Sequence, residues 1–183
     1  MLAYLDIETT SLKASDGMIV AIGLLKGEKP EVRFAGTLQE ERAALEWFCR
    51  ELEGCTTLVT WNGAEFDVPF LFTRAVFHSI DLGELLEISM LDLYGWCRGH
   101  MILSSYKLES VGRFLNINKS QMFHGGDVLT LFKLAGQGDF EARKLIVEHC
   151  KEDIVLLKLV HERLKPLVER SGWGSSRKNS KKE

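Results

Sequence analysis

Three short segments at the start of this chain are expected to form strands, and the first two are apolar. Residues 1–8 contain the run Leu2-Ala-Tyr-Leu5, residues 18–25 are almost wholly apolar, and residues 31–35 form a shorter third segment. The first two do not alternate between apolar and polar side chains, which is typical of strands that are buried on both faces. Three strands in succession favour an antiparallel start to a sheet, so we expect the fold to be built around that sheet.

Helices and strands alternate in the rest of the chain. Thr37 and Glu40 form a capping box, and apolar residues at helical spacing follow as far as Gly54. The other expected elements are strands at 57–61 and 87–91, a helix from near Pro69, and helices at 106–115, 128–135 and 140–164, the last ending before Pro166. This order indicates an α/β layered domain, with helices flanking a mixed five-stranded sheet whose first three strands are antiparallel.

The length of 183 residues fits a single domain, which we place at residues 1–168. Residues 169–183 are rich in Gly and Ser and then basic, and we expect them to form a disordered tail. Hydrophobic residues make up 45% of the chain, yet no apolar run approaches the roughly 18 residues of a membrane-spanning helix. With no secretory signal at the N-terminus either, a cytoplasmic location is expected.

The cysteine content and the net charge exclude several classes of function. The four cysteines form no CxxC pair, which argues against a zinc knuckle and a disulfide framework. The net charge is −3, but residues 171–183 carry +3, which leaves −6 for the first 170 residues. An acidic body argues against nucleic-acid binding through a bulk positive field, so phosphate chemistry here requires local sites or bound cations.

Asp6 and Glu8 are the first candidates for such a site. They stand two residues apart at the end of the first expected strand, so both side chains emerge on the same face. Ionised carboxylates at the end of a buried strand are costly unless a positive charge meets them, and no Lys or Arg lies between residues 1 and 12. Taken alone, the pair also fits a solvent-facing strand end.

Further acids occur in two later segments. Asp67 lies just before the expected Pro69 helix start, where capping that helix is an ordinary role for an aspartate. In the last expected helix His149 and Asp153 fall on the apolar, core-facing side, one turn apart. That pair could satisfy itself, or it could serve a site together with the other acids.

These carboxylates become chemically meaningful if they converge. Four of them within a few ångströms cannot all ionise unaided, whereas two divalent cations would neutralise them and would find oxygen ligands that hard cations prefer. Two such ions clamp the attacking and leaving oxygens of a phosphodiester displacement and make a bound water a nucleophile. We therefore expect a site for two Mg²⁺ or Mn²⁺ ions at Asp6, Glu8, Asp67 and Asp153.

The sequence resembles the DEDD superfamily of 3′-to-5′ exonucleases over about residues 1 to 165. The match is close to the branch that contains the proofreading domains of family B DNA polymerases and small stand-alone predicted ribonuclease H-like exonucleases. The residues that carry the resemblance are Asp6-Ile-Glu8-Thr-Thr, Trp61-Asn-Gly-Ala-Glu-Phe-Asp67-Val-Pro-Phe, Ser105-Tyr-Lys-Leu-Glu-Ser-Val111 and His149-Cys-Lys-Glu-Asp153-Ile. Three motifs together are specific, although each one is weak by itself.

The resemblance implies a ribonuclease H-like fold and a role for each motif residue. It implies that Asp6 bridges both metals, that Glu8 and Asp153 bind the ion that activates water, and that Asp67 serves the second ion. It also implies contacts with the substrate, in which Thr9, Thr10 and Leu12 lie against the terminal nucleotide, Asn62 and Phe66 hold the strand, and Lys107 meets a phosphate.

One residue departs from the branch. Its last motif usually reads Tyr-x-x-x-Asp, with the tyrosine orienting the attacking water, whereas this chain has His149 at that spacing from Asp153. The other large branch of the superfamily has a histidine one residue farther from the aspartate. Because a helical residue displaced by one position turns by about 100°, His149 is expected in the tyrosine's place and not in that histidine's. Imidazole accepts a proton near neutral pH, which suits a general base.

The predicted function is a metal-dependent 3′-to-5′ exonuclease that acts on the 3′ end of single-stranded nucleic acid, with DNA favoured over RNA. It would release nucleoside monophosphates by a two-metal-ion mechanism. Two alternatives stay open. One is a nucleic-acid-binding module that is weak or inactive as an enzyme, which the His149 substitution suggests. The other is a proofreading or repair subunit that works with a polymerase or repair partner.

Overall fold

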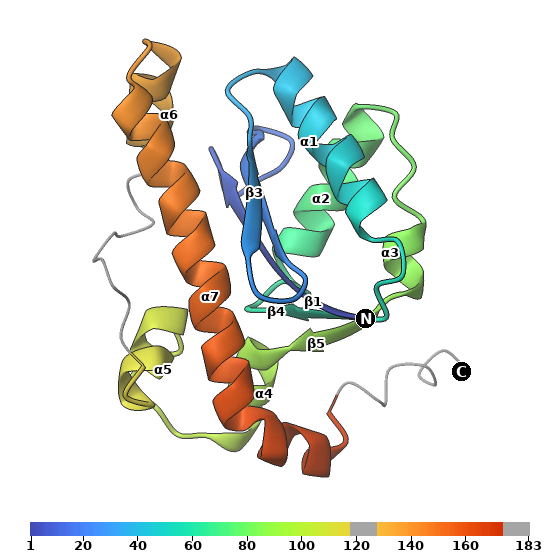
Figure 1. The fold of residues 1–183 in the computed structure, drawn as a ribbon, viewed down its shortest axis with the longest axis vertical. Helices are drawn as coiled ribbons and strands as arrows, with labels where there is room; N and C mark the ends of the chain where they lie inside the picture. Colours follow the sequence, from blue (N-terminus) through green and yellow to red (C-terminus); the bar gives the residue numbers. More distant parts are fainter. Residues whose placement is uncertain (118–127, 174–183) are drawn as a thin grey trace.

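The computed structural model describes residues 1–117 and 128–173 and contains a five-stranded sheet in the order β3-β2-β1-β4-β5 (Figure 1). β1 pairs antiparallel with β2 and β2 with β3, while β1 and β4, and β4 and β5, are parallel. The predicted mixed sheet with three antiparallel strands first is therefore confirmed. The strands are β1 (Leu2–Thr9), β2 (Ile19–Leu25), β3 (Pro30–Phe34), β4 (Thr57–Thr60) and β5 (Ser89–Asp92).

Helices cover both faces of the sheet (Figure 1). The helices α1 (Leu38–Glu51), α2 (Asp67–Phe77) and α3 (Glu84–Glu87) contribute to one buried core, together with Leu5 and Ile7 of β1. The helices α4 (Leu93–His100), α5 (Leu108–Phe114), α6 (Val128–Gly136) and α7 (Phe140–Ser171) supply residues to or against a second core, which also contains Tyr4. None of the helices in these described ranges is long and apolar enough to cross a membrane.

Strand β1 separates the two cores by simple alternation. Leu5 and Ile7 point into the core with α1 and α2, whereas Tyr4 belongs to the core beneath α7 and hydrogen-bonds His161 of that helix at 2.9 Å. Because side chains two residues apart share a face, Asp6 and Glu8 continue the row that Tyr4 begins. Both acids therefore project toward α7.

Most expected elements are present, with shifted ends. The capping box of α1 is confirmed, since the Thr37 side chain accepts a hydrogen bond from the Glu40 amide. The fifth strand was expected to begin at residue 87, but it begins at Ser89 because Glu87 ends the short helix α3. The helix α4 was not predicted; the side chain of Asp92 caps its start by accepting a hydrogen bond from the Gly95 amide. Its eight residues hold two glycines, which disfavour helix in isolation.

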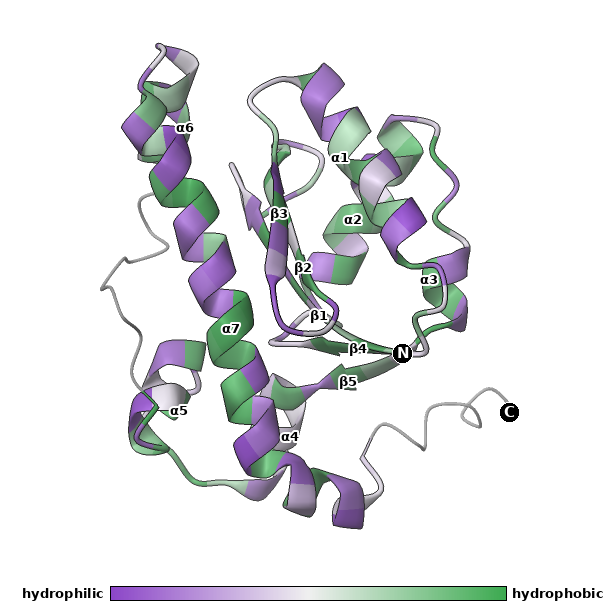
Figure 2. Cartoon of the chain, viewed as in Figure 1, coloured by the Kyte–Doolittle hydropathy of each residue, from purple (hydrophilic) through white to green (hydrophobic). Residues whose placement is uncertain are grey.

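The last helix corrects the sequence prediction. It was expected to end at residue 164, before Pro166, but α7 continues through Pro166 to Ser171, so the domain boundary drawn at residue 168 falls inside a helix. A proline removes one hydrogen bond of a helix, but burial of Val168 beyond it offsets that cost. Figure 2 shows hydrophobic and hydrophilic residues alternating along α7, as expected of a helix with one buried side. The basic end of the predicted tail lies outside the described residues.

Candidate metal centre

The helix α7 places two candidate residues opposite Glu8. Nε2 of His149 lies 3.6 Å from Oε1 of Glu8 and 3.4 Å from Oδ2 of Asp153, one turn further along α7. One ligand atom from each of these three residues lies within 4.8 Å of the others. The side chains of Glu8 and His149 are buried. The self-satisfied His149–Asp153 pair is therefore only part of the arrangement, because a third group from β1 joins it.

Asp67 reaches the same region from the other side of the sheet. It is the first residue of α2 and is only 6% exposed. Burial raises the pKa of this carboxyl to about 7; hydrogen bonds from the backbone of Asp67 and Ile7 act in the opposite direction, and the charge of Asp92 adds to the rise. The hydrogen bond with Ile7 fixes the carboxyl of Asp67 against β1, between Asp6 and Glu8 in sequence.

Asp6 is where these charges meet. Burial, followed by the charges of Glu8, Asp153 and Asp67, raises the pKa of Asp6 well above its usual value. Its Oδ2 atom is buried and accepts no hydrogen bond from any residue within 1–117 or 128–173. The four carboxylates predicted to converge are thus close enough for three of them to act electrostatically on the fourth.

The residues present fit divalent cations. A buried carboxylate oxygen without a hydrogen-bond donor needs a positive charge, and Asp6 Oδ2 is such an atom. The neighbouring ligand atoms are mostly carboxylate oxygens, which suit Mg²⁺ and Mn²⁺. Glu8 and Asp153 of this cluster can hold one ion, and Asp6 lies close enough to Glu8, Asp153 and Asp67 for their charges to act on it.

The three candidates for contact with a terminal nucleotide follow Glu8 directly. The hydroxyl of Thr9 donates to the carbonyl of Ser11 at 2.8 Å, and the Thr10 hydroxyl accepts a hydrogen bond from the Met18 amide at 3.0 Å. Leu12 is 86% exposed. An apolar side chain held so far into solvent beside a polar site is available for contact with a ligand.

The second group of substrate candidates lies around the turn after β4. Asn62 has a φ of 64°, and a single carboxylate, that of Asp92, accepts hydrogen bonds from the amides of Asn62 and Ala64, each at 3.1 Å. The same carboxylate caps α4 through the Gly95 amide. Asp92 therefore does more than cap α4, because it also holds the turn that leads to Phe66 and Asp67.

Phe66 and Lys107 occupy different surroundings. Phe66 is partly buried, with its ring centre 5.6 Å from that of Phe70, so only part of it is available to a strand. Lys107 is exposed at the start of α5. The indole of Trp61 donates to the carbonyl of Tyr106 at 3.1 Å, which ties the segment that carries Lys107 to the Asn62 turn.

Two residues with a part in this site were missed from the sequence. Gly23 pairs with Asp6 across the β1–β2 ladder, and a Cβ atom there would lie 2.2 Å from Ile154 Cδ1 and 2.6 Å from Cys150 Sγ. Its lack of a side chain therefore lets α7 approach the sheet. The Cys150 thiol donates to the carbonyl of Asp6 at 3.8 Å, and burial with the nearby acids raises its pKa. The sequence around Gly23 is an apolar run, and nothing in it indicates that this glycine faces α7.

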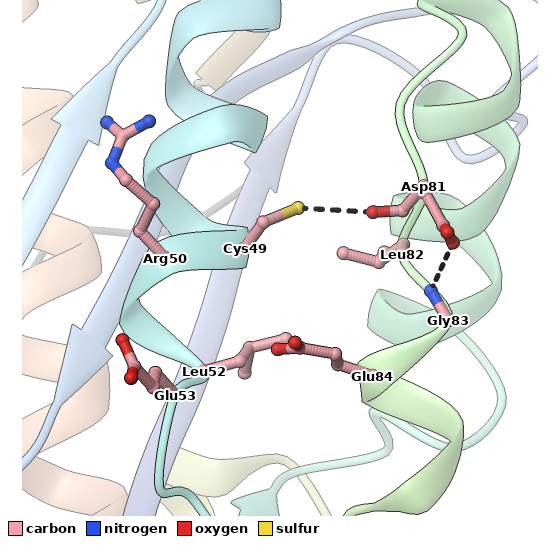
Figure 3. Close-up of a pocket in the computed structure, with 8 residues that line it drawn as sticks. All are labelled: Cys49, Arg50, Leu52, Glu53, Asp81, Leu82, Gly83 and Glu84. Atoms are coloured by element: carbon pink, nitrogen blue, oxygen red, sulfur yellow. Dashed lines mark hydrogen bonds between the residues drawn. The ribbon is translucent and has the colours of Figure 1, made fainter.

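A separate pocket of about 410 Å³ lies between the end of α1 and the segment before α3 (Figure 3). In it the Cys49 thiol donates to the carbonyl of Asp81, and the Asp81 carboxylate accepts from the Gly83 amide. Burial raises the pKa of Cys49, so this thiol is not activated. None of the candidate acids lines this pocket.

Comparisons with known proteins agree with this geometry. A model described as the RNase H superfamily matches residues 3–165. An uncharacterized protein of Methanocaldococcus jannaschii is 29% identical over 157 residues, which make up 83% of this chain and 88% of that protein. The family B DNA polymerase of the hyperthermophilic archaeon Pyrobaculum calidifontis has a similar fold, with a TM-score of 0.71 and 17% identity over 91% of this chain. This chain spans only 25% of the polymerase chain.

Proposed function

Since this chain belongs to the RNase H superfamily and has its ribonuclease H-like fold, a nuclease-type function follows, and we propose specifically a metal-dependent 3′-to-5′ exonuclease. Its substrate would be the 3′ end of single-stranded nucleic acid, with DNA favoured over RNA, and its products nucleoside monophosphates. The observation that carries the proposal is the buried Oδ2 atom of Asp6, which has no hydrogen-bond donor among the described residues. Burial, followed by the charges of Glu8, Asp153 and Asp67, also raises the pKa of this carboxyl.

The four carboxylates of this proposal are those that would hold two divalent cations, Mg²⁺ or Mn²⁺. Glu8 and Asp153 would bind one ion, Asp67 would serve the other, and Asp6 would contact both. Such ions supply a nucleophilic water at neutral pH and stabilise the negative charge that develops on the phosphate. The chain contributes the fixed positions of these oxygens, on a strand and two helices packed around it.

His149 would act as the proton acceptor of the reaction. Its Nε2 atom lies between the carboxylates of Glu8 and Asp153, at 3.6 and 3.4 Å. An imidazole accepts a proton near neutral pH, so Nε2 would take the proton that the attacking water loses. The same carboxylates fix the orientation of the ring, which is buried, so that Nε2 faces the acids.

The remaining candidate residues would bind the strand. Thr9, Thr10 and Leu12 would meet the terminal nucleotide, and Asn62, Phe66 and Lys107 would contact the strand behind it. A single strand suits these contacts, because rings and exposed apolar side chains bind bases only when the bases are unstacked. The acidic body of the chain agrees with a site that relies on bound cations instead of a basic surface.

A second candidate function is a nucleic-acid-binding module with little or no turnover. It is favoured by one observation, the histidine at position 149 where the resembling branch has tyrosine. A third proposal, a proofreading or repair subunit, rests on the similarity of the fold to part of a DNA polymerase. Copurification with a polymerase or another repair protein would support the third proposal.

One degradation assay tests the proposed activity. Single-stranded DNA, RNA and mismatched duplex, each labelled at the 5′ end, are incubated with Mg²⁺, Mn²⁺ or chelator. We expect a descending ladder from single-stranded DNA with either metal and none with chelator. Intact oligonucleotides under every condition would refute the exonuclease and favour the binding module.

The matched variants are two substitutions on the same helix. Asp153→Asn is expected to lower the rate at least about a hundredfold, the upper range for disturbing a metal shell. Glu148→Gln changes an exposed acid that pairs with Lys151, and it should leave the rate unchanged. Full activity in Asp153→Asn would contradict the assigned ligand set.

A further inference from the structure

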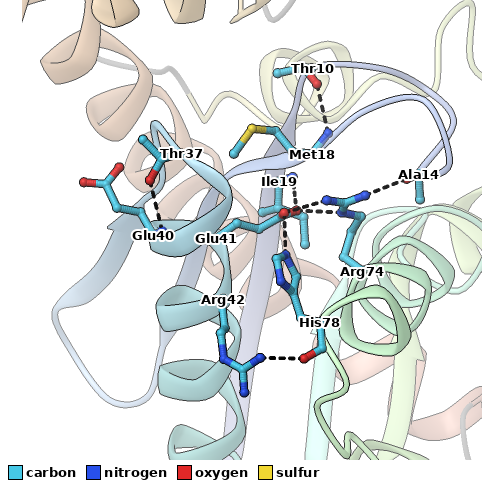
Figure 4. Close-up of polar contacts among 10 residues, drawn as sticks. All are labelled: Thr10, Ala14, Met18, Ile19, Thr37, Glu40, Glu41, Arg42, Arg74 and His78. Atoms are coloured by element: carbon cyan, nitrogen blue, oxygen red, sulfur yellow. Dashed lines mark hydrogen bonds and ion pairs between the residues drawn. The ribbon is translucent and has the colours of Figure 1, made fainter.

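Three charged or titratable side chains are buried together away from the candidate metal centre. Glu41 of α1 is 0% exposed, Arg74 of α2 is 5% exposed, and His78 at the end of α2 is 9% exposed. The Glu41 carboxylate accepts hydrogen bonds from Nε and Nη2 of Arg74 at 2.8 and 2.7 Å and lies 2.8 Å from Nε2 of His78 (Figure 4). We call these three residues the buried triad. Burying charged groups costs free energy even when they are paired, so the further contacts of these side chains indicate which segment they stabilise.

The buried triad extends to the loop that connects β1 with β2. Nη1 of Arg74 donates to the carbonyl of Ala14 in the middle of this loop at 3.2 Å. At the end of the loop, Oε1 of Glu41 accepts a hydrogen bond from the Ile19 amide at 2.7 Å. The residues at 10–18 are therefore fastened at two points by side chains from two different helices (Figure 4).

The fastened end of the loop lies at an irregularity beside the candidate site. The β1–β2 register shifts between Glu8 and Thr9, and Thr9 then faces Ile19, whose amide is taken by Glu41. Thr10 continues the pairing through two hydrogen bonds with Met18, each of 3.0 Å. A bulge changes the direction of the strand that contains it. Because Glu41 binds the amide opposite this irregularity, the triad helps to set the direction of the chain just after Glu8.

The same loop forms one wall of an open groove. The groove has a volume of about 520 Å³, and its other walls come from Leu38 of α1, from α2, including Arg74 of the buried triad, and from α6. Its lining includes Thr10 and Met18 of the loop, Phe77 of α2, and Phe132 and Lys133 of α6. Aromatic rings with a lysine beside a polar loop are the surface chemistry of single-stranded nucleic acid sites.

We propose that Glu41, Arg74 and His78 are positioning residues that hold the 10–18 loop as the wall of a groove for the substrate strand. This proposal rests on the proposed exonuclease function and adds residues that act on strand binding. A triad with only a structural role could be replaced by apolar side chains of similar volume. Such a replacement would leave the Ala14 carbonyl and the Ile19 amide without the partners that fasten the loop.

Two variants separate these roles. Arg74→Lys keeps a positive charge for Glu41 but lacks the planar fork that also reaches Ala14. The triple variant Glu41→Met, Arg74→Met, His78→Leu removes the buried charges and keeps the volume, and it guards against a single variant that fails to fold. Glu46→Gln is the control, because Glu46 is a partly exposed residue of α1 that pairs with Arg42.

The measurements are the rate on 5′-labelled oligothymidine with Mn²⁺, thermal melting, and amide hydrogen exchange of peptides covering residues 10–18. For both test variants we expect KM to rise about tenfold, which corresponds to the free energy of one or two hydrogen bonds. The value of kcat should stay within about twofold of wild type. Exchange in the loop should be faster, and the triple variant should still melt cooperatively. The control should match wild type in all three.

The possible failures are distinguishable. If the wild-type protein releases no nucleotide, the proposed function is refuted and this proposal falls with it. If the wild type is active and both test variants fold but keep the wild-type KM and loop exchange, the positioning role alone is overturned. A fall in kcat with unchanged KM would also overturn it, because strand binding would then be unaffected.

Discussion

Among single residues, Asp6 has the least favourable surroundings for an ionised side chain. Burial and the charges of three neighbouring carboxylates oppose its ionisation. Its Oδ2 atom also lacks a donor among the described residues. A fold that keeps such a group spends stability on it, as is common at sites selected for binding or catalysis.

Asp6→Asn should therefore separate stability from activity. Without metal, removing the charge should raise the free energy of unfolding by about 1–2 kcal/mol, because the repulsion from Glu8, Asp67 and Asp153 disappears. Activity should fall at least about a hundredfold. Urea unfolding at pH 8 with chelator checks the first effect and the oligonucleotide assay the second.

Glu31→Gln provides the comparison for that variant, since Glu31 lies exposed on β3. Its unfolding free energy should stay within about 0.5 kcal/mol of wild type. If Asp6→Asn were strongly destabilising in chelator, Asp6 would be a structural residue and the repulsion argument would be wrong.

Individual site residues were predictable from the sequence to different degrees. The spacing of Asp6 and Glu8 fixes a common face of β1, and the apolar stripe of α7 fixes the inward side for His149 and Asp153. The contact of Asp67 with the Ile7 backbone was not predictable. It depends on how closely α2 packs on β1, which no local pattern encodes.

Among the elements, α7 packs close to the sheet because residue 23 of β2 is a glycine. A side chain at Gly23 would overlap Ile154 and Cys150, both of which come from α7. The helix therefore lies as close to β2 as a glycine allows, and this sets how near Asp153 comes to Asp6 on the adjacent strand.

Gly23→Ala should move α7 outward. The added methyl group overpacks a filled core, which typically costs about 1–3 kcal/mol of stability. Activity should fall by more than the loss of folded protein explains, because Asp153 moves relative to Asp6. Thermal melting and the kcat of the purified variant test this, and Gly99→Ala, where an added Cβ meets nothing within 4 Å, is the control.

The end of α7 shows why element boundaries were hard to predict. Pro166 is a stop signal in the sequence, but tertiary contacts outweigh it beyond that point. The indole of Trp96 donates to the Ser171 hydroxyl at 3.0 Å, and the indole of Trp173 donates to the carbonyl of Asp92 at 3.3 Å. These partners lie about 75 and 81 residues away in the chain, so a local pattern cannot contain them.

For the molecule as a whole, the acidic charge constrains how it meets nucleic acid. The first 170 residues carry −6, and the phosphates of the proposed substrate are also negative. Attraction must then come from bound cations and from contacts with bases, and these depend on salt less steeply than contacts between basic side chains and phosphates.

Oligonucleotide binding should accordingly be controlled by divalent cations. Using the wild-type protein with Mn²⁺ and a hydrolysis-resistant phosphorothioate oligonucleotide, we expect fluorescence anisotropy to show a slope of log affinity against log salt of about −1 to −2. Chelator should weaken binding at least about tenfold. A slope near −6 that persists in chelator would indicate a basic binding surface and contradict this prediction.

The buried triad makes a contribution to global stability that depends on pH. Burial by itself raises the pKa of Glu41, but hydrogen bonds from Arg74, His78 and Ile19 and the charge of Arg74 outweigh it, so the folded pKa lies below the usual value of 4.5. A carboxyl with a lowered pKa stabilises the fold above its unfolded pKa and loses that effect as pH falls through the folded value.

Glu41→Gln should thus be destabilised by about 3–5 kcal/mol at pH 7, the cost of breaking a buried ion pair. The difference from wild type should shrink as pH falls below 4.5, because the wild-type carboxyl is then also neutralised. Urea unfolding between pH 3 and 7 measures it. A difference that stays constant over this range would show that the charge of Glu41 does not contribute.

For the whole molecule, the sequence predicted the architecture better than the buried polar contacts between its elements. Apolar runs, caps and acid spacing are local features, and they led to the five-stranded sheet and to the region of the candidate centre. The buried triad was missed because Glu41, Arg74 and His78 look like ordinary polar residues on amphipathic helices. Their roles come from contacts between α1, α2 and the 10–18 loop.

Asp92 has a consequence for anyone who reads mutations in this protein. One carboxylate serves both the turn at Asn62 and the start of α4, so neither segment can be loosened there without the other. In a genetic screen a substitution at this position would resemble the loss of a reacting group. Its lowered melting temperature would reveal that a shared anchor had been removed.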